Sequence, residues 1–178
     1  MADGDYSQHL LEVARMMELA ARTAPKTKGE DYVKVKVVSG ANIEKLAEAM
    51  LEYGKQSKRA NFDRDAAGVK RCPAVMIIGL KDAKTGGLNC GACGHESCAE
   101  LEKAAKSIGD YQGPICAYRL LDMGIALGSA AKTAQILNAD NRIMYRIGVA
   151  ARRAGMVDWD FAMGIPLSAT GKNIFFDR

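Results

Sequence analysis

The sequence lacks a long uncharged apolar run and a concentration of charge of one sign. Its most apolar stretch, residues 115–137, is interrupted by Arg119, Asp122 and Lys132. It therefore falls short of the roughly 18 apolar residues that indicate a membrane-spanning helix, and we interpret it as a buried helix. The 25 Lys and Arg are mixed with 21 Asp and Glu along the chain, and few aromatic residues lie beside the basic ones. We expect neither a membrane nor a nucleic acid as partner.

Several catalytic, targeting and linker signatures are also missing. No Ser-His-Asp set, Walker loop or paired-carboxylate motif stands out, so hydrolase and phosphotransferase activities have no support. The first residues include Asp3 and Asp5 rather than the basic start and apolar run of a secretory signal, which predicts a cytoplasmic location. The 178 residues contain no repeat or low-complexity linker. We expect one α/β domain over residues 1–178.

Hydrophobic periodicity predicts alternating helices and strands in the first half of the chain. A helix is expected from Ser7, which would cap it, to the residue before Pro25. Valines that alternate with lysines predict a strand over 32–38 with one solvent-exposed face. Asn42 is expected to cap a second helix, and the uninterrupted apolar run 74–80 predicts a strand buried on both faces.

The second half of the chain predicts two more helices and a final strand. Asp140 or Asn141 is expected to cap the later helix, Gly155 to end it, and a strand to follow over 160–166. The inward residues expected on the later helix are Ile143, Met144, Ile147 and Ala151. The earlier, long helix has one apolar face of Leu120, Gly124, Leu127, Ala131 and Ala134, and an adjacent one of Leu121, Ile125 and Gly128. Two apolar faces require cover on more than one side, which favours a homodimer, with burial between the sheet and flanking helices of one chain as the alternative.

Four of the five cysteines have the spacing C-x2-C-x4-C-x17-C, at Cys90, Cys93, Cys98 and Cys116. In a reduced compartment such clustering indicates a metal site rather than disulfides. Structural zinc sites usually consist of two close cysteine pairs. Here the fourth cysteine stands alone, which favours one 4Fe-4S cluster bound by the segment 90–116, with zinc or four ordinary buried cysteines as alternatives.

The residues around the cysteines fit a negatively charged cluster. Gly91 and Gly94 follow two of the cysteines and allow tight turns that aim backbone N–H groups at sulfur. Cys98 and Cys116 are expected at helix starts, where negative charge is stabilised. His95 receives no role and is expected to be exposed. Cys72 is interpreted as a small apolar core residue, with a resolving or fifth-ligand thiol as the alternative.

The stretch from Cys90 to Cys116 resembles the single-cluster domain of Rnf-type electron-transport subunits and of corrinoid iron–sulfur proteins, in which CGxCGxxxC precedes a helix and a distant fourth cysteine. Over its full length the chain resembles a family of uncharacterised ferredoxin-domain-containing proteins. The segments on which this resemblance depends are ARTAPKTKGED, CGACGHESCAEL, YRLLDMGIALGSAAK, DNRIMYRIGVAARRAG and GIPLSATGKNIFFDR. The resemblance implies a cluster but names no reaction.

The order of elements also resembles that of the nitroreductases, with matching points at 24–25, 73–79 and 164–166. This resemblance implies a nitroreductase-like three-layer α/β sandwich with an inserted cluster loop, a homodimer, and FMN at the dimer interface. The Arg-x-Ser-x-Arg phosphate motif of that family is absent. Residues 24–29 could border a flavin ring, and the basic side chains available to a phosphate are Arg22, Lys26, Lys172 and Arg178.

Three functions follow from these patterns. The favoured one is a redox protein that passes single electrons through a 4Fe-4S cluster to a flavin or to a partner oxidoreductase. The second is a binding or interaction module in which a cluster or a zinc ion only stabilises the fold. The third is an FMN-dependent, nitroreductase-like enzyme.

Overall fold

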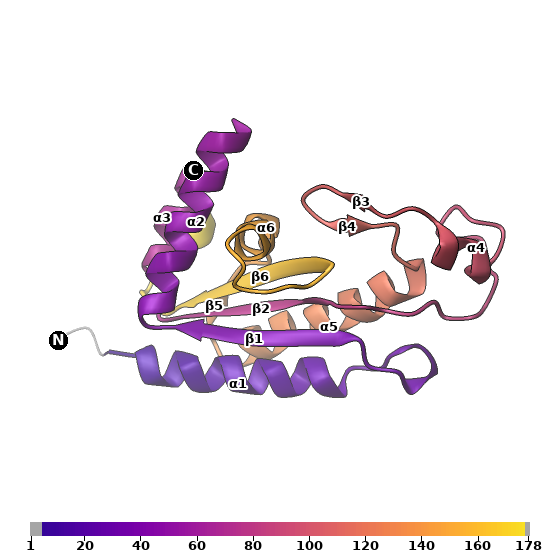
Figure 1. Ribbon diagram of the computed structural model, residues 1–178. Helices are drawn as coiled ribbons and strands as arrows, with labels where there is room; N and C mark the ends of the chain where they lie inside the picture. Colours follow the sequence, from indigo (N-terminus) through magenta and orange to yellow (C-terminus); the bar gives the residue numbers. More distant parts are fainter. Residues whose placement is uncertain (1–4, 177–178) are drawn as a thin grey trace.

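The computed structural model describes residues 5–176 and shows a sheet between two layers of helices (Figure 1). Within these residues no helix combines the length and the apolar character that crossing a membrane requires. In chain order the elements are α1 (Ser7–Thr23), η1 (Thr27–Gly29), β1 (Val33–Ser39), α2 (Ala41–Ser57), α3 (Phe62–Lys70), β2 (Ala74–Leu80), α4 (Cys98–Lys103), β3 (Ser107–Ile108), β4 (Gln112–Gly113), α5 (Ala117–Ile136), β5 (Asp140–Asn141), α6 (Tyr145–Arg153), β6 (Phe161–Ser168) and η2 (Ile174–Phe176).

The main sheet has the strand order β1-β2-β6-β5, and every neighbouring pair is antiparallel. β2 lies inside it and is buried along its whole length, as its apolar run predicts. Met76 and Ile78 pack toward α1 and α5, whereas Val75 and Ile77 pack toward α2, α3 and α6. Because successive side chains of a strand point to opposite faces, this one strand contributes to both layers of the core.

The N-terminal helix follows its predicted pattern, since Leu10, Ala14, Met17 and Ala21 are all buried. Two expected caps are wrong. The residue in the capping position of α1 is Tyr6, and the carboxylate of Asp5 accepts the N–H of Ser7 at 2.9 Å. Gly40 rather than Asn42 precedes α2, with a φ of 57°, a conformation that glycine adopts without the steric cost of a Cβ.

The segment 140–144 also differs from the prediction. Asp140 and Asn141 do not cap a helix but form β5, which pairs with the end of β6. Met144 bridges to Gly164, and α6 begins at Tyr145. The helix starts later because this segment extends the sheet edge before the chain turns. The short helix α3 and the β3–β4 hairpin were not predicted.

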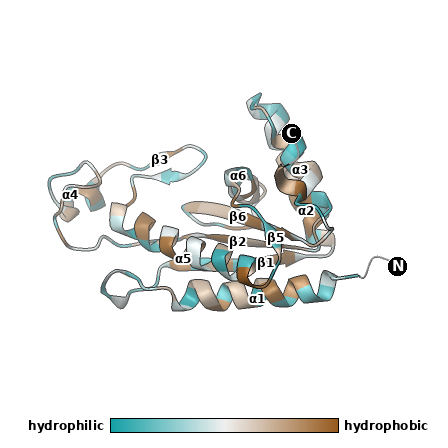
Figure 2. Cartoon of the chain, turned by 180° about the vertical axis from the view of Figure 1, so that it is seen from behind, coloured by the Kyte–Doolittle hydropathy of each residue, from teal (hydrophilic) through white to brown (hydrophobic). Residues whose placement is uncertain are grey.

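The first apolar face predicted for α5 is only partly covered within the chain. Ala134 is buried and Gly124 is exposed, while the remaining members are partly buried against the core: Leu120, Leu127 and Ala131. The buried face instead consists of Arg119, Asp122, Met123, Ala126, Ala130 and Ala134. The adjacent apolar face remains exposed within the chain, with Leu121 at 59% and Ile125 at 45% of their full exposure. Figure 2 shows apolar residues along α5 and α1.

Helix α6 packs on β6 with almost no space between the two backbones. A Cβ added at Gly148 would lie 1.8 Å from the carbonyl oxygen of Ala162 and 2.7 Å from the backbone nitrogen of Met163. These are backbone atoms of a central strand, so they cannot move aside as a side-chain tip would. Glycine is therefore required for this close approach.

We expect Gly148→Ala to destabilise the protein by about 3 kcal/mol or more, because overpacking a core costs this order of energy when the neighbours cannot relax. Chemical denaturation followed by circular dichroism would measure the loss. Gly68→Ala is the matched control: its added Cβ meets only a side-chain atom of Phe175 at 3.8 Å, and alanine favours the helix. An unfolding free energy of Gly148→Ala equal to that of the control would contradict the packing argument.

Candidate metal centre

The four clustered cysteines line one pocket. Cys90, Cys93 and Cys98 come from the long connection after β2, and Cys116 directly precedes α5. This part of the chain, including α4, projects beyond one end of the main sheet (Figure 1). Cys90 is exposed, Cys93 and Cys98 are half-buried, and Cys116 is buried. The fold thus brings together cysteines that are separated in the sequence, with one of them open to solvent.

The cysteine loop has the backbone conformation that its glycines predict. Gly91 has a φ of +72° and Gly94 a φ of +84°, values that L-residues rarely adopt. The N–H of Gly94 donates to the carbonyl of Gly91 at 2.9 Å. These turns keep the loop compact, so that Cys90 and Cys93 face the same pocket.

The other two cysteines stand at helix starts, as expected. Cys98 is the first residue of α4, where the Ser97 hydroxyl accepts the N–H of Glu100 at 3.2 Å. The Glu100 carboxylate in turn accepts the N–H of Glu96 at 3.1 Å. This arrangement resembles a capping box. Cys116 occupies the N-terminal capping position of the 20-residue helix α5, where the helix dipole favours negative charge.

The surroundings of Cys98 favour its thiolate form. The N–H of Asn89 donates to its sulfur at 3.4 Å, and its own N–H donates to the Asn89 side-chain oxygen at 2.9 Å. The hydrogen bond from Asn89 lowers the pKa of Cys98, with further contributions from Thr85, Gly87 and Leu88. The thiolate is the form that binds metal, so these contacts favour the form of Cys98 that a metal ligand requires.

The pocket does not gather its sulfurs around a single point. Among residues 5–176, no group of three His, Cys, Asp or Glu side chains is placed to hold one metal ion. A four-iron cluster does not need such a point, because each of its four thiolates binds a different iron. His95 also lines the pocket and is half-buried, so the expectation that it is simply exposed is wrong.

Cys72 lies in the core rather than in this pocket. It is 5% exposed and packs with the residues of the layer formed by α2, α3 and α6. Its thiol donates to the carbonyl of Gly68 at 3.1 Å, and burial raises its pKa to about 12. Its interpretation as a core residue agrees with this position.

The basic residues considered for a flavin phosphate are largely engaged elsewhere. Arg22 pairs with Asp31 at 2.8 Å. The ammonium of Lys26 is almost fully buried and donates at 2.9–3.0 Å to three carbonyls at the end of α1. Lys172 is exposed, and Arg178 lies outside the described residues. Arg22, within α1, and Lys26, just after it, therefore stabilise the chain around the end of that helix.

Sequence reasoning missed the role of Arg119 next to the pocket. Its side chain is fully buried and contacts two loops as well as Asp122. The sequence signal that could have indicated it was its position. Arg119 is a charged residue in a largely apolar helix, three residues after Cys116 and three before Asp122.

Comparison with protein families identifies a match for the C-terminal part of the chain. The family is described as an uncharacterized protein containing a ferredoxin domain, and its model matches residues 112–178, which include Cys116 but not the other three cysteines of the pocket. An uncharacterized protein of Archaeoglobus fulgidus is 47% identical over 175 residues, which are 98% of this chain and 95% of that protein.

Comparison with solved structures identifies the fold. One similar structure is the FMN-dependent nitroreductase NfnB of Mycobacterium smegmatis in complex with NADPH. The TM-score is 0.59 at 14% sequence identity, and the match covers 90% of this chain and 78% of the NfnB chain. A nitroreductase with bound FMN from Desulfitobacterium hafniense has a TM-score of 0.57 at 14% sequence identity. This match covers 97% of this chain and 81% of the nitroreductase chain. The mixed α/β arrangement of this chain is thus the nitroreductase fold, as its element order predicts.

Proposed function

Because the chain belongs to the family of uncharacterised proteins that contain a ferredoxin domain, we propose that it is an iron–sulfur redox protein with one 4Fe-4S cluster. Cys90, Cys93, Cys98 and Cys116 are its ligands in this proposal. The observation that supports it most is that these four thiols, distant in sequence, line one pocket, while Cys72 lies in the core. Four thiolates are the usual ligand set of such a cluster.

The surroundings of the pocket suit a cluster of net negative charge. Cys116 stands in the capping position at the N-terminus of α5, where the helix dipole stabilises negative charge. Backbone N–H groups of the loop 87–89 lower the pKa of Cys98, and such hydrogen bonds to sulfur also tune cluster potentials. The described cysteines are all free thiols, which agrees with a reducing, cytoplasmic compartment.

The chemistry that the cluster supplies when bound is one-electron transfer. The chain brings the four thiols to one pocket and leaves Cys90 exposed. Cys90 belongs to the connection between β2 and α4, which projects beyond one end of the main sheet (Figure 1). A flavin or a partner oxidoreductase can therefore approach this side of the pocket without any opening of the main sheet. Electron transfer is the function that this exposure favours.

We expect anaerobically purified protein to be brown and to contain about four irons and four acid-labile sulfides per chain. Dithionite should bleach the visible absorbance reversibly, because a functional cluster accepts one electron. Metal analysis, sulfide analysis and visible spectra measure this directly. Stoichiometric zinc without sulfide would overturn the proposal, and a metal centre that is silent to reductant would favour the alternative of a structural module.

An FMN-dependent activity is the second candidate. It is favoured by the fold, which this chain shares with nitroreductases whose descriptions name FMN. The engaged positions of Arg22 and Lys26 weaken the proposed phosphate contacts at the end of α1. A yellow chromophore, released by heat from the purified protein and fluorescent as free flavin, would support this candidate. Its absence after reconstitution with FMN would count against it.

We further propose that the protein is a homodimer that pairs through α5. Leu121 and Ile125 are exposed on this helix, and a Cβ added at Gly124 or Gly128 would meet nothing within 4 Å. An apolar face with small residues allows another helix to approach closely, and two-fold symmetric dimers are the commonest oligomers. A second copy of this chain therefore suits the α5 face.

A further inference from the structure

Arg119 is a fully buried charge beside the four-cysteine pocket. It lies on the first turn of α5, and its backbone N–H donates to the carbonyl of Cys116 at 3.0 Å. Burying a guanidinium is costly unless it is paired and its N–H groups find acceptors. The contacts of this side chain therefore indicate what the fold gains from its position.

All three guanidinium nitrogens of Arg119 donate hydrogen bonds. Nε donates to the carbonyl of Lys84 at 2.9 Å and Nη2 to that of Thr85 at 3.5 Å. Nη1 donates to the carbonyl of Thr27 at 3.0 Å and to Asp122 at 3.2 Å, and Nη2 also pairs with Glu30. One side chain thus joins three segments: η1 with its following residue, the connection after β2, and α5.

Asp122 strengthens the same junction. Asp122 is 4% exposed. Its carboxylate accepts both the backbone N–H and the hydroxyl of Thr27 at 2.8 Å. The guanidinium also lies over the ring of Tyr32, 4.7 Å from its centroid. Lysine could not reproduce this set of contacts, because only arginine offers five N–H donors in a planar fork.

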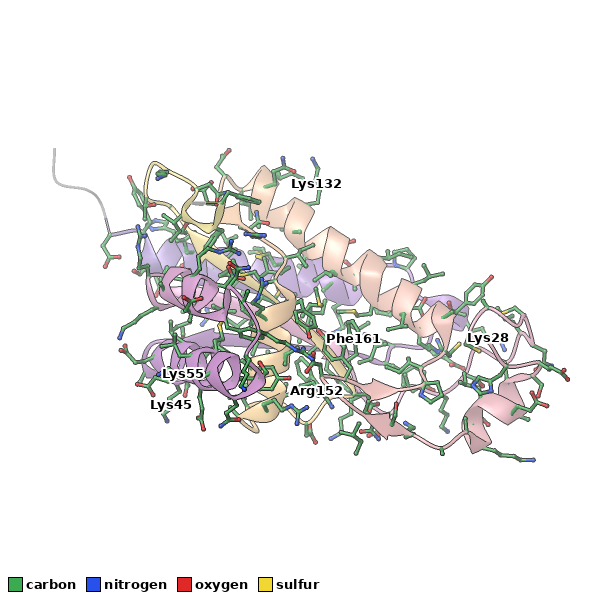
Figure 3. All side chains as sticks on the ribbon, turned by 90° about the horizontal axis from the view of Figure 1, so that it is seen from above. Lys28, Lys45, Lys55, Lys132, Arg152 and Phe161 are labelled. Carbon is green, nitrogen blue, oxygen red and sulfur yellow. The ribbon has the colours of Figure 1, made fainter. Side chains whose placement is uncertain are left out.

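The connection that Arg119 holds leads directly into the cysteine loop. Lys84 and Thr85 are bound through their carbonyls, and four residues later Asn89 exchanges hydrogen bonds with Cys98. Figure 3 shows Lys28, from η1, at the cysteine-loop end of the molecule, whereas Lys132 lies toward the other end of α5. Arg119 therefore connects the segment that sets Cys98 with the helix that presents Cys116.

We propose that Arg119 is a positioning residue that fixes the distance between the three-cysteine loop and Cys116, so that the fourth thiol reaches the cluster. This inference rests on the proposed cluster. Without the planar guanidinium of Arg119, the three-cysteine loop and α5 are free to separate. Cys116 is then the ligand that is lost first. The expected consequence is a cluster that assembles on the loop but releases iron readily.

Arg119→Lys is the test, since it keeps the charge and removes the fork. Loss of such supporting contacts typically weakens metal binding by about 10- to 100-fold, so we expect iron to be released to a chelator at least about 10-fold faster than from the wild-type protein. The iron content should fall toward about three irons per four sulfides, because one ligand is displaced. Both are measured anaerobically on the reconstituted full chain.

Arg146→Lys is the matched control. Arg146 also pairs with a buried carboxylate, that of Asp65 at 2.7 Å, and also lies over an aromatic ring, but in the layer of α3 and α6. It should lose stability without a change in iron release. Equal release rates in Arg119→Lys and the wild-type protein would overturn the inference, as would equal acceleration in both variants.

Glu30→Gln keeps the test decisive if Arg119→Lys does not fold. Glu30 is half-exposed and contacts only one nitrogen of the guanidinium, so this variant should fold and release iron faster than the wild-type protein by a smaller factor. An unchanged rate would again overturn the inference. A wild-type protein that binds no cluster would instead contradict the proposed function, so the two failures are distinguishable.

Discussion

Serine in place of Cys90, Cys93 or Cys98 is expected to abolish cluster binding, with iron falling from about four per chain to near zero. The oxygen of serine is a harder and weaker ligand for iron than a thiolate. The three residues share one short loop and line one pocket, so the loss of one ligand leaves the remaining loop thiols without a complete site. Iron and sulfide analysis after anaerobic reconstitution measures the effect.

Cys116→Ser and Cys72→Ser test the identity of the fourth ligand. Cys116 lines the pocket, whereas Cys72 lies in the core beneath α2 and α3. We therefore expect Cys116→Ser to lose iron, to about three irons per four sulfides or fewer, and Cys72→Ser to retain the full cluster with lower stability. If Cys72→Ser loses iron while Cys116→Ser keeps it, the assignment of Cys116 is wrong.

Leu121→Glu is expected to convert the proposed dimer into a monomer. Each buried leucine contributes about 2 kcal/mol, and a two-fold interface contains the residue twice. The loss of about 4 kcal/mol corresponds to a dissociation constant about 1,000-fold weaker, and two buried carboxylates add to it. Light scattering at micromolar concentration should then report the mass of one chain instead of two.

Leu51→Glu is the control for this substitution. Leu51 is 38% exposed on α2, in the helical layer on the other side of the sheet, and its change should leave the mass unchanged. A wild-type protein that is monomeric and keeps its cluster would contradict the dimer. It would also remove most of the case for a flavin at a subunit interface.

The sequence predicts those parts of the fold whose pattern has one solution. A short apolar run such as 74–80, which follows Pro73, favours a strand covered on both faces over a helix, and β2 is such a strand. α5 has two apolar faces, and hydrophobicity alone cannot tell which of them meets the sheet. The structure turns Arg119 and Asp122 inward, because they satisfy each other and nearby carbonyls, and leaves Leu121 outside.

The sequence indicates the four cysteines that line one pocket, but not the contacts that support this pocket. Residue type and spacing indicate the four thiols, and the positive φ of Gly91 and Gly94 follows from their place in the loop. The contacts of Arg119 with Thr27 and Lys84 join residues far apart in the chain. Such contacts depend on how helices and loops are packed, which local patterns do not encode.

The burial of Cys72 separates the thiols of this protein into two chemical classes. With a pKa of about 12 and 5% exposure, only about one Cys72 side chain in ten thousand is ionised at pH 8, and alkylating reagents attack the thiolate. In the folded protein, thiol labelling therefore reports the pocket cysteines that solvent reaches, Cys90, Cys93 and Cys98, without a background from Cys72. The number of labelled thiols per chain then measures how many of these three proposed ligands are unoccupied.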